Sequence, residues 1–91
     1  MQIDIPTQEQ AALQQQFEHF GFAYTVRPTE DLEQYSVGNV LETPWGRSVR
    51  ISELSGHKTV DDYPFPDMLS DEQKADAADR DGFVIMKLDY V

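Results

Sequence analysis

The side chains that most often carry out chemistry in proteins are few in this sequence. It has no cysteine, and its two histidines, His19 and His57, have no serine motif of the Gly-x-Ser-x-Gly type around them. The glycines are scattered along the chain, whereas a phosphate-binding loop needs them clustered at the start of a helix. We therefore expect no catalytic residues; the sequence favours a non-enzymatic chain and leaves the enzymatic alternative open.

Carboxylates are abundant and could in principle hold a hard cation. They gather at Asp61, Asp62, Asp67, Asp71 and Glu72, but without the Asp-x-Asp-x-Asp-Gly order of a calcium loop and with prolines between them. Neither histidine has a second ligand at metal-binding spacing. The sequence predicts no metal and no other cofactor.

Large apolar side chains in loop-like segments are the most unusual feature. Residues 62–69 set aromatic and methionine side chains and two prolines between acids, and a tryptophan follows Pro44 in a predicted turn. Such residues either cover an open end of a small sheet or dock a partner, since aromatic and methionine side chains are common in binding surfaces. The candidate binding residues are Trp45, Arg50, Tyr63, Phe65 and Met68. We expect Trp45, Tyr63, Phe65 and Arg50 to lie on or near one face.

Charge restricts the classes of partner. Seventeen acidic residues against seven basic ones give a formal net charge of −10, which opposes general binding to nucleic acids and anionic membranes. Arg47, Arg50 and Lys58 form the one local group of cations. The first seven residues do not resemble a secretory signal, and no window is apolar enough to span a membrane. With no cysteine present, we expect a cytoplasmic protein.

Helical and strand signals alternate along the chain. Thr7 and Gln10 have the spacing of a capping box, and Leu13, Phe17 and Phe20 form an apolar stripe that ends at Gly21, so we expect a helix over residues 8–20. Strands are predicted at 22–26, 37–43, 48–54 and 83–91, with a turn at 44–46. Residues 55–65 are a predicted connection with one helical turn near Val60. A second capping box at Ser70 begins a short helix that ends near residues 81–82.

These elements predict a single α+β domain over residues 1–91. An N-terminal helix packs on a small, strongly curved, barrel-like mixed sheet of four or five strands, with a short helix before the last strand. The expected core consists of Leu13, Phe17, Phe20, Tyr24, Val26, Val40, Leu41, Val49, Ile51, Leu69, Phe83, Ile85, Met86 and Leu88.

One stretch carries a resemblance to a known family. Residues 35–46 open a strand with Val37-Gly38-Asn39-Val40, and a strand, a helical insert and the closing strand 83–88 follow. This order resembles small barrels of the PUA-like superfamily, of which the ASCH group is most similar. The resemblance implies an RNA- or nucleotide-related function or an amidohydrolase activity. The family's Gly-x-Lys-x-x-Glu-x-Arg signature is missing from residues 46–53, so no catalytic residue is transferred.

Three functions are compatible with these features. The first is a non-catalytic binding or regulatory module that uses the Trp45 turn and the 63–68 loop to bind a protein partner. The second takes up the PUA-like resemblance and places RNA or a nucleotide against Arg47, Arg50 and Lys58. The third is an acidic mimic of nucleic acid that inhibits a basic protein. The oligomeric state is left open.

Overall fold

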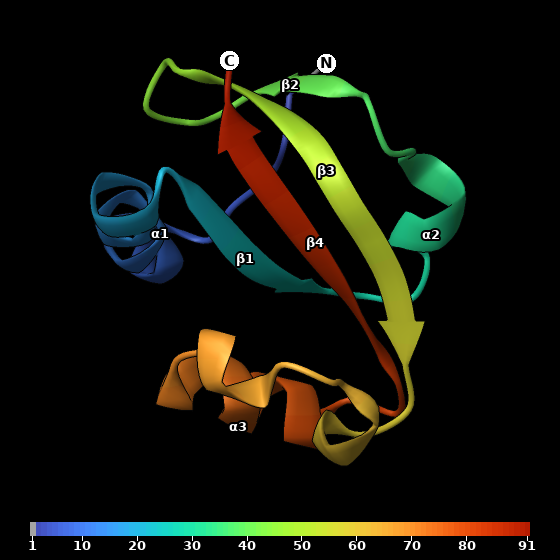
Figure 1. Cartoon of the computed structure of the whole chain (residues 1–91). Helices are drawn as coiled ribbons and strands as arrows, with labels where there is room; N and C mark the ends of the chain where they lie inside the picture. Colours follow the sequence, from blue (N-terminus) through green and yellow to red (C-terminus); the bar gives the residue numbers. More distant parts are fainter. Residues whose placement is uncertain (1) are drawn as a thin grey trace.

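The computed structural model describes residues 2–91, which form four strands and several helices (Figure 1). In chain order these are α1 (Thr7–Phe20), β1 (Phe22–Arg27), α2 (Asp31–Gln34), β2 (Val40–Glu42), β3 (Ser48–His57), the 3-10 helices η1 (Val60–Asp62) and η2 (Pro66–Met68), α3 (Asp71–Asp79) and β4 (Phe83–Tyr90). The predicted α+β class is confirmed, with a helix at the N-terminus and a short helix before the last strand.

The sheet is open, and its order is β1-β4-β3-β2. Every pairing between these strands is antiparallel, and the one parallel contact is an isolated bridge between Gln2 and Glu42. The expectation of a mixed, barrel-like sheet is therefore wrong. Closure would require β1 and β2 to meet, but they remain at opposite edges of the sheet (Figure 1).

Both faces of the sheet are covered, because successive side chains of a strand point to opposite faces. Met86 and Leu88 of β4 belong to one buried cluster, with Leu13 and Phe17 of α1. Ile85 of β4 belongs to a second cluster, which contains residues from the η1–α3 segment. Ile85 and Met86 are thus both buried, as expected, although they point in opposite directions.

Helix α1 begins one residue earlier than predicted and lacks the predicted capping box. Pro6 is the N-cap residue and makes no side-chain hydrogen bond, while Gln10 Nε2 donates to the Ile5 carbonyl at 3.1 Å. The end of the helix is as predicted: Gly21 adopts φ 77° and donates its N–H to the Phe17 carbonyl at 2.8 Å. No helix in residues 2–91 is long and apolar enough to cross a bilayer.

Helix α3 begins with the predicted capping box. Ser70 Oγ accepts from the Gln73 N–H at 3.1 Å, and Gln73 Oε1 accepts from the Ser70 N–H at 2.9 Å. The helical turn expected near Val60 is η1. The predicted strands at 37–43 and 48–54 are instead β2, which is shorter, and β3, which runs on to His57.

Two of the expected core residues are on the surface. Phe20 is 59% exposed and Val40 is 45% exposed. Phe20 is the last helical residue and stacks on Phe22 with ring centroids 5.7 Å apart, beyond the end of the face that α1 buries. Val40 points away from the core because β2 buries only its central residue, Leu41. Buried hydrophobic residues absent from the expected set are Ile3, Ile5, Ala23, Tyr63, Ala77 and Val84.

Helix α2 was not predicted from the sequence. Its Asp31 is 4% exposed and accepts a hydrogen bond from Arg27 Nε at 2.7 Å, and Arg27 Nη1 also donates to the Asp4 carbonyl at 2.6 Å. These contacts tie the end of β1 to the N-terminal segment and to α2. They leave α2 beside β3, where Leu32 lies over Gly56.

Candidate peptide-binding edge

The five predicted site residues divide between the two sides of the sheet. Trp45 is half-buried against the first cluster, where its Nε1 donates to Tyr90 Oη at 3.1 Å and its ring meets Phe17 edge-on. Trp45 is therefore largely a packing residue. Arg50 is exposed on β3 and lies opposite Asp89 in the register.

The other three residues lie at the second cluster. Tyr63 is 5% exposed, and Met68 is half-buried against the same cluster. Phe65 is 60% exposed and meets the Tyr63 ring edge-on at 6.2 Å between centroids. The expectation that Trp45 shares one face with Tyr63 and Phe65 is wrong, because the sheet separates the two clusters. Tyr63 and Phe65 remain together.

The structure shows a second feature beside Phe65, namely an unpaired length of sheet edge. Strand β2 pairs with β3 only from residue 48 to residue 50, and two further bonds join Gly38 and Asn39 to Ile51. Residues 53–57 pair with β4 on one side. On their other side, no loop or helix within residues 2–91 forms a backbone hydrogen bond with them. We call this length the β3 edge.

The opposite edge of the sheet is closed by side chains. Gln16 of α1 accepts the Tyr24 N–H of β1 at 3.0 Å, and Gln73 of α3 donates to the Tyr24 carbonyl at 2.6 Å. Blocked edges protect natural sheets from unwanted strand pairing. The fold therefore satisfies the outward backbone groups of Tyr24 at one edge, whereas residues 53–57 at the other edge have α2 beside them but no backbone partner.

A β-bulge decides which side chains surround the β3 edge. The β3–β4 register shifts between Ile51 and Glu53, so Ile51 lies opposite Leu88 of the first cluster, while Ser55 lies opposite Ile85 of the second. Without the extra residue, positions 51 and 55 would share a face. The bulge therefore turns Glu53, Ser55 and His57 toward the side where Tyr63 and Phe65 lie.

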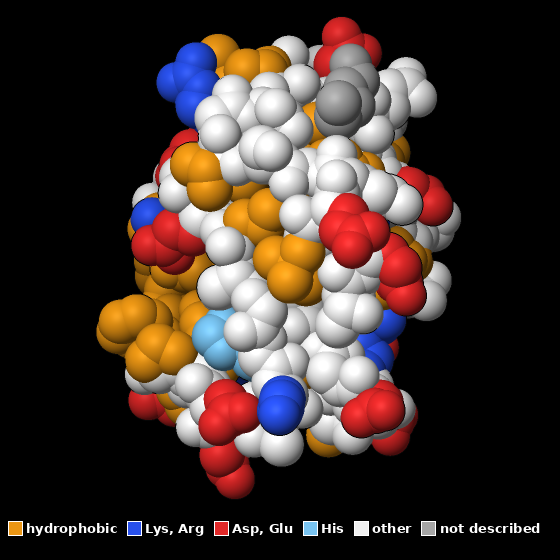
Figure 2. All heavy atoms as spheres, turned by 90° about the vertical axis from the view of Figure 1, so that its right-hand side faces the viewer, with side chains coloured by type: hydrophobic (Ala, Val, Ile, Leu, Met, Phe, Trp, Pro, Cys, Tyr) orange, Lys and Arg blue, Asp and Glu red, His pale blue; other side chains and the backbone are white. Residues whose placement is uncertain are grey.

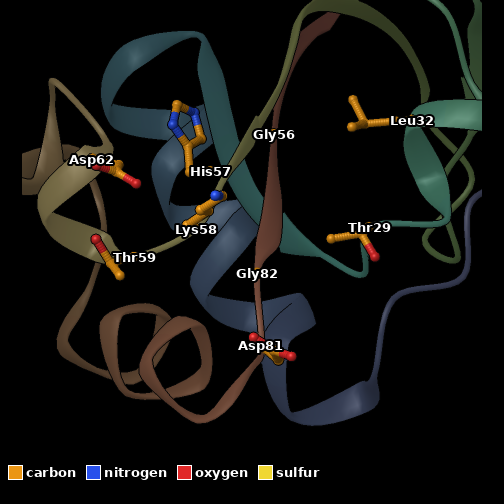
Figure 3. A pocket seen from close by; sticks show the side chains of 9 residues that line it. All are labelled: Thr29, Leu32, Gly56, His57, Lys58, Thr59, Asp62, Asp81 and Gly82. Carbon is orange, nitrogen blue, oxygen red and sulfur yellow. The ribbon is translucent and has the colours of Figure 1, made fainter.

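An open groove lies at the end of the β3 edge (Figure 3). Its volume is about 940 Å³, and we call it the glycine groove. Leu32 and Thr29 stand on one side, and His57, Lys58, Thr59 and Asp62 on the other (Figure 3). It is also lined by Gly56, Asp81 and Gly82.

Two glycines line this groove for different reasons. A Cβ at Gly56 would lie 2.9 Å from Leu32 Cδ1, so glycine at this position of β3 makes room for the Leu32 side chain. Gly82, just before β4, has φ +88°, which residues other than glycine rarely adopt.

A smaller hollow of about 390 Å³ lies on the Phe65 side of the same edge, and we call it the Phe65 pocket. It is lined by Glu53, Leu54, Ser55, His57, Tyr63, Pro64 and Phe65. His57 lines both hollows, so they adjoin along β3. Figure 2 looks onto the side of the molecule that carries α2 and shows apolar patches bordered by acidic side chains.

Ser55 and His57 form the one pair in this region with catalytic residue types. Ser55 Oγ lies 2.7 Å from His57 Nε2, and the imidazole packs against Tyr63 with ring centroids 5.1 Å apart. A serine nucleophile also needs a group that orients its base and donors for an oxyanion. No carboxylate hydrogen bond to His57 occurs within residues 2–91, so the pair lacks the orienting group of a triad.

Burial dominates the electrostatics of the Phe65 pocket. It raises the pKa of Tyr63 to about 12, with smaller contributions from Tyr24 and the Glu53 carboxylate. Tyr63 Oη is buried and has no hydrogen-bond partner among the described residues. The Tyr24 pKa is also raised, first by burial and then by Glu53 and Asp89. Both phenols are thus neutral at physiological pH.

Cations are not concentrated at any one place on β3. Arg47 precedes the strand and lies over the Tyr90 ring at 4.0 Å, whereas Lys58 follows the strand and lines the glycine groove. At roughly 3.3 Å per residue, the length of β3 separates the two. The RNA-binding edge that the PUA-like resemblance implied stays a prediction, as does the acidic mimic.

No group of three or more His, Asp or Glu side chains within residues 2–91 is arranged to hold a metal ion. The bulge and the unpaired β3 edge were not predicted from the sequence. The available signal was Gly56, which lies in the residues that continue the predicted strand 48–54.

Comparison with known protein families, curated proteins and solved structures found no match for this chain.

Proposed function

We propose that the chain is a non-catalytic binding module that takes an extended segment of a partner protein as an added strand along the β3 edge. The observation that carries the proposal is that residues 53–57 lack a neighbouring strand on one side, while a hollow lies on each side of the same length. In strand addition, main-chain hydrogen bonds supply affinity, and pockets for alternate side chains supply specificity.

The two hollows suit the geometry of a strand. Successive side chains of an incoming segment point to opposite faces, so one set would enter the glycine groove beside Leu32 and the other the Phe65 pocket. An antiparallel segment would continue the direction of β2, which already pairs with β3 in that sense. The exposed backbone at Gly56 lets the added chain approach closely.

The size of the edge sets the strength of binding. A segment paired with residues 53–57 covers only about 17 Å of strand. The surface area that it buries is therefore below that of a standard stable interface. We therefore expect a transient complex with micromolar or weaker affinity. The net charge of −10 limits self-association through the open edge.

Selection from a library of random peptides displayed on phage tests this function. Bound peptides should protect amides in residues 53–57 from hydrogen exchange. Leu32→Lys and Phe65→Lys should each abolish binding, because each replaces an apolar lining side chain of one hollow with a positive charge. Phe20→Lys is the matched control, since Phe20 is as exposed as Phe65 and lines neither hollow.

The proposal fails if selection yields no binders. It also fails if the selected peptides bind the Leu32 and Phe65 variants as well as the wild type, or protect amides elsewhere. Thermal unfolding of each variant separates loss of binding from loss of fold.

A further inference from the structure

Two aromatic rings elsewhere in the molecule have a cation over one face. Arg47 Cζ lies 4.0 Å from the Tyr90 ring centroid, and Lys87 Nζ lies 4.5 Å from that of Phe22. Phe65 is 60% exposed, and no cation of residues 2–91 lies over its ring. Its outer face is therefore open to a cation from another chain.

The Phe65 pocket also contains an exposed carboxylate, that of Glu53. Glu53 forms no ion pair within 4.0 Å in the described part of the chain, where the two salt bridges join Arg27 to Asp31 and Arg80 to Asp76. The adjoining glycine groove has two carboxylates, Asp62 and Asp81, against the single ammonium of Lys58. The charge along the edge thus favours a basic segment.

We infer that the segment bound at the β3 edge is basic, with an arginine side chain stacked on Phe65 and its guanidinium directed to Glu53. This inference rests on the proposed function. Arginine fits better than lysine because its planar guanidinium stacks on an aromatic face and can bond a carboxylate with two parallel donors. The residues before and after this arginine point to the glycine groove, where Leu32 favours a small aliphatic side chain.

A second copy of this chain fits the edge less well. Each copy carries a net charge of −10, and the described part of the β3 edge offers a partner only Lys58 as a lining cation. A basic segment is instead attracted by the same negative net charge, and this long-range attraction raises the rate at which it encounters the protein.

Two blocked peptides provide the test, one alternating valine with arginine and the other alternating valine with glutamate. Hydrogen exchange and NMR titration should show that the arginine peptide protects residues 53–57 and that the glutamate peptide does not. Phe65→Ala and Glu53→Gln should each weaken the arginine peptide by roughly fivefold, which corresponds to the loss of one cation–π contact or one exposed ion pair. Added salt should weaken it further.

Phe20→Ala and Glu42→Gln are matched controls, since both residues are exposed and lie outside the Phe65 pocket. Neither change should alter binding of the arginine peptide. If Glu42→Gln weakens it as much as Glu53→Gln, the attraction is only the general charge of the protein, and the inference is wrong.

The remaining outcomes separate the inference from the proposed function. If the glutamate peptide protects residues 53–57 as well as the arginine peptide does, or if Phe65→Ala and Glu53→Gln leave binding unchanged, strand addition stands and the basic partner is wrong. If neither peptide protects the edge and library selection also fails there, both are wrong. Protection that grows with protein concentration alone would make a second copy the occupant and overturn the inference.

Discussion

Replacing Phe17 with alanine tests whether α1 anchors the fold through one buried aromatic side chain. Phe17 is 3% exposed, and its ring stacks on Tyr90 with centroids 4.0 Å apart and planes inclined by 15°. Emptying a buried phenylalanine site costs about 3–5 kcal/mol. A domain of this length has a total stability of about 5–14 kcal/mol, so the variant should lose a large fraction of it.

Urea denaturation followed by far-UV circular dichroism measures this loss. Phe20→Ala provides the matched control, because it removes the same side chain from the same helix at a position that is 59% exposed. It should change the free energy of unfolding by no more than about 0.5 kcal/mol. Phe17→Leu should fall between the two, since it keeps most of the buried volume and loses the stacked ring.

The reasoning is refuted if Phe17→Ala costs less than about 1 kcal/mol, below the range for an emptied buried aromatic site. It is equally refuted if Phe20→Ala costs as much as Phe17→Ala. That result would mean that the outer end of α1 is packed in solution.

Three further predictions concern polar groups. Gln73→Ala should destabilise the protein by about 1–2 kcal/mol in urea denaturation, because Gln73 both completes the α3 capping box and donates to the β1 edge. Asp31→Ala should cost about 3 kcal/mol in the same assay, since it leaves Arg27, whose side chain is only 11% exposed, without its carboxylate partner. Tyr63→Phe should raise the unfolding midpoint at neutral pH, because it removes a buried hydroxyl without a protein partner. The folded-state pKa of Tyr63 is about 12, against about 10 in the unfolded chain. Between pH 10 and 12 the unfolded chain therefore loses the Tyr63 proton while the folded protein keeps it, and the free energy of unfolding falls as the pH rises. Tyr63→Phe should show a smaller fall when stability is measured across that range.

Local signals predicted the elements whose boundaries are fixed by their own residues. The Ser70 capping box and the left-handed Gly21 act within a few positions of themselves, and both are as the sequence indicates. Phe20 and Val40, which were expected in the core but are exposed, show what hydrophobic periodicity cannot predict. The periodicity indicates which residues share a face, but not where the neighbouring elements stop covering that face.

The sheet arrangement depended on long-range pairing and was not predictable in the same way. An alternating pattern over residues 48–54 places Ile51 and Glu53 on one face, whereas the bulge puts them on opposite faces. Residues 53–57 have one neighbouring strand because β2 pairs with β3 only at residues 48–50, whereas β4 continues beside β3 to His57. No local pattern in β3 predicts where β2 stops.

The two edges of this sheet together argue for a site better than either edge does alone. At the β1 edge, Gln16 and Gln73 reach from different helices to the same residue, Tyr24, so outward backbone groups there are satisfied from both sides. At the β3 edge, the nearest element is α2, which meets Gly56 through the apolar Leu32 and supplies no backbone partner. An open edge that merely escaped closure would need no flanking hollows, yet this one has an exposed aromatic ring on one side and a glycine-lined groove on the other. Strand addition uses all three features, which is why we prefer it to a purely structural account of Phe65.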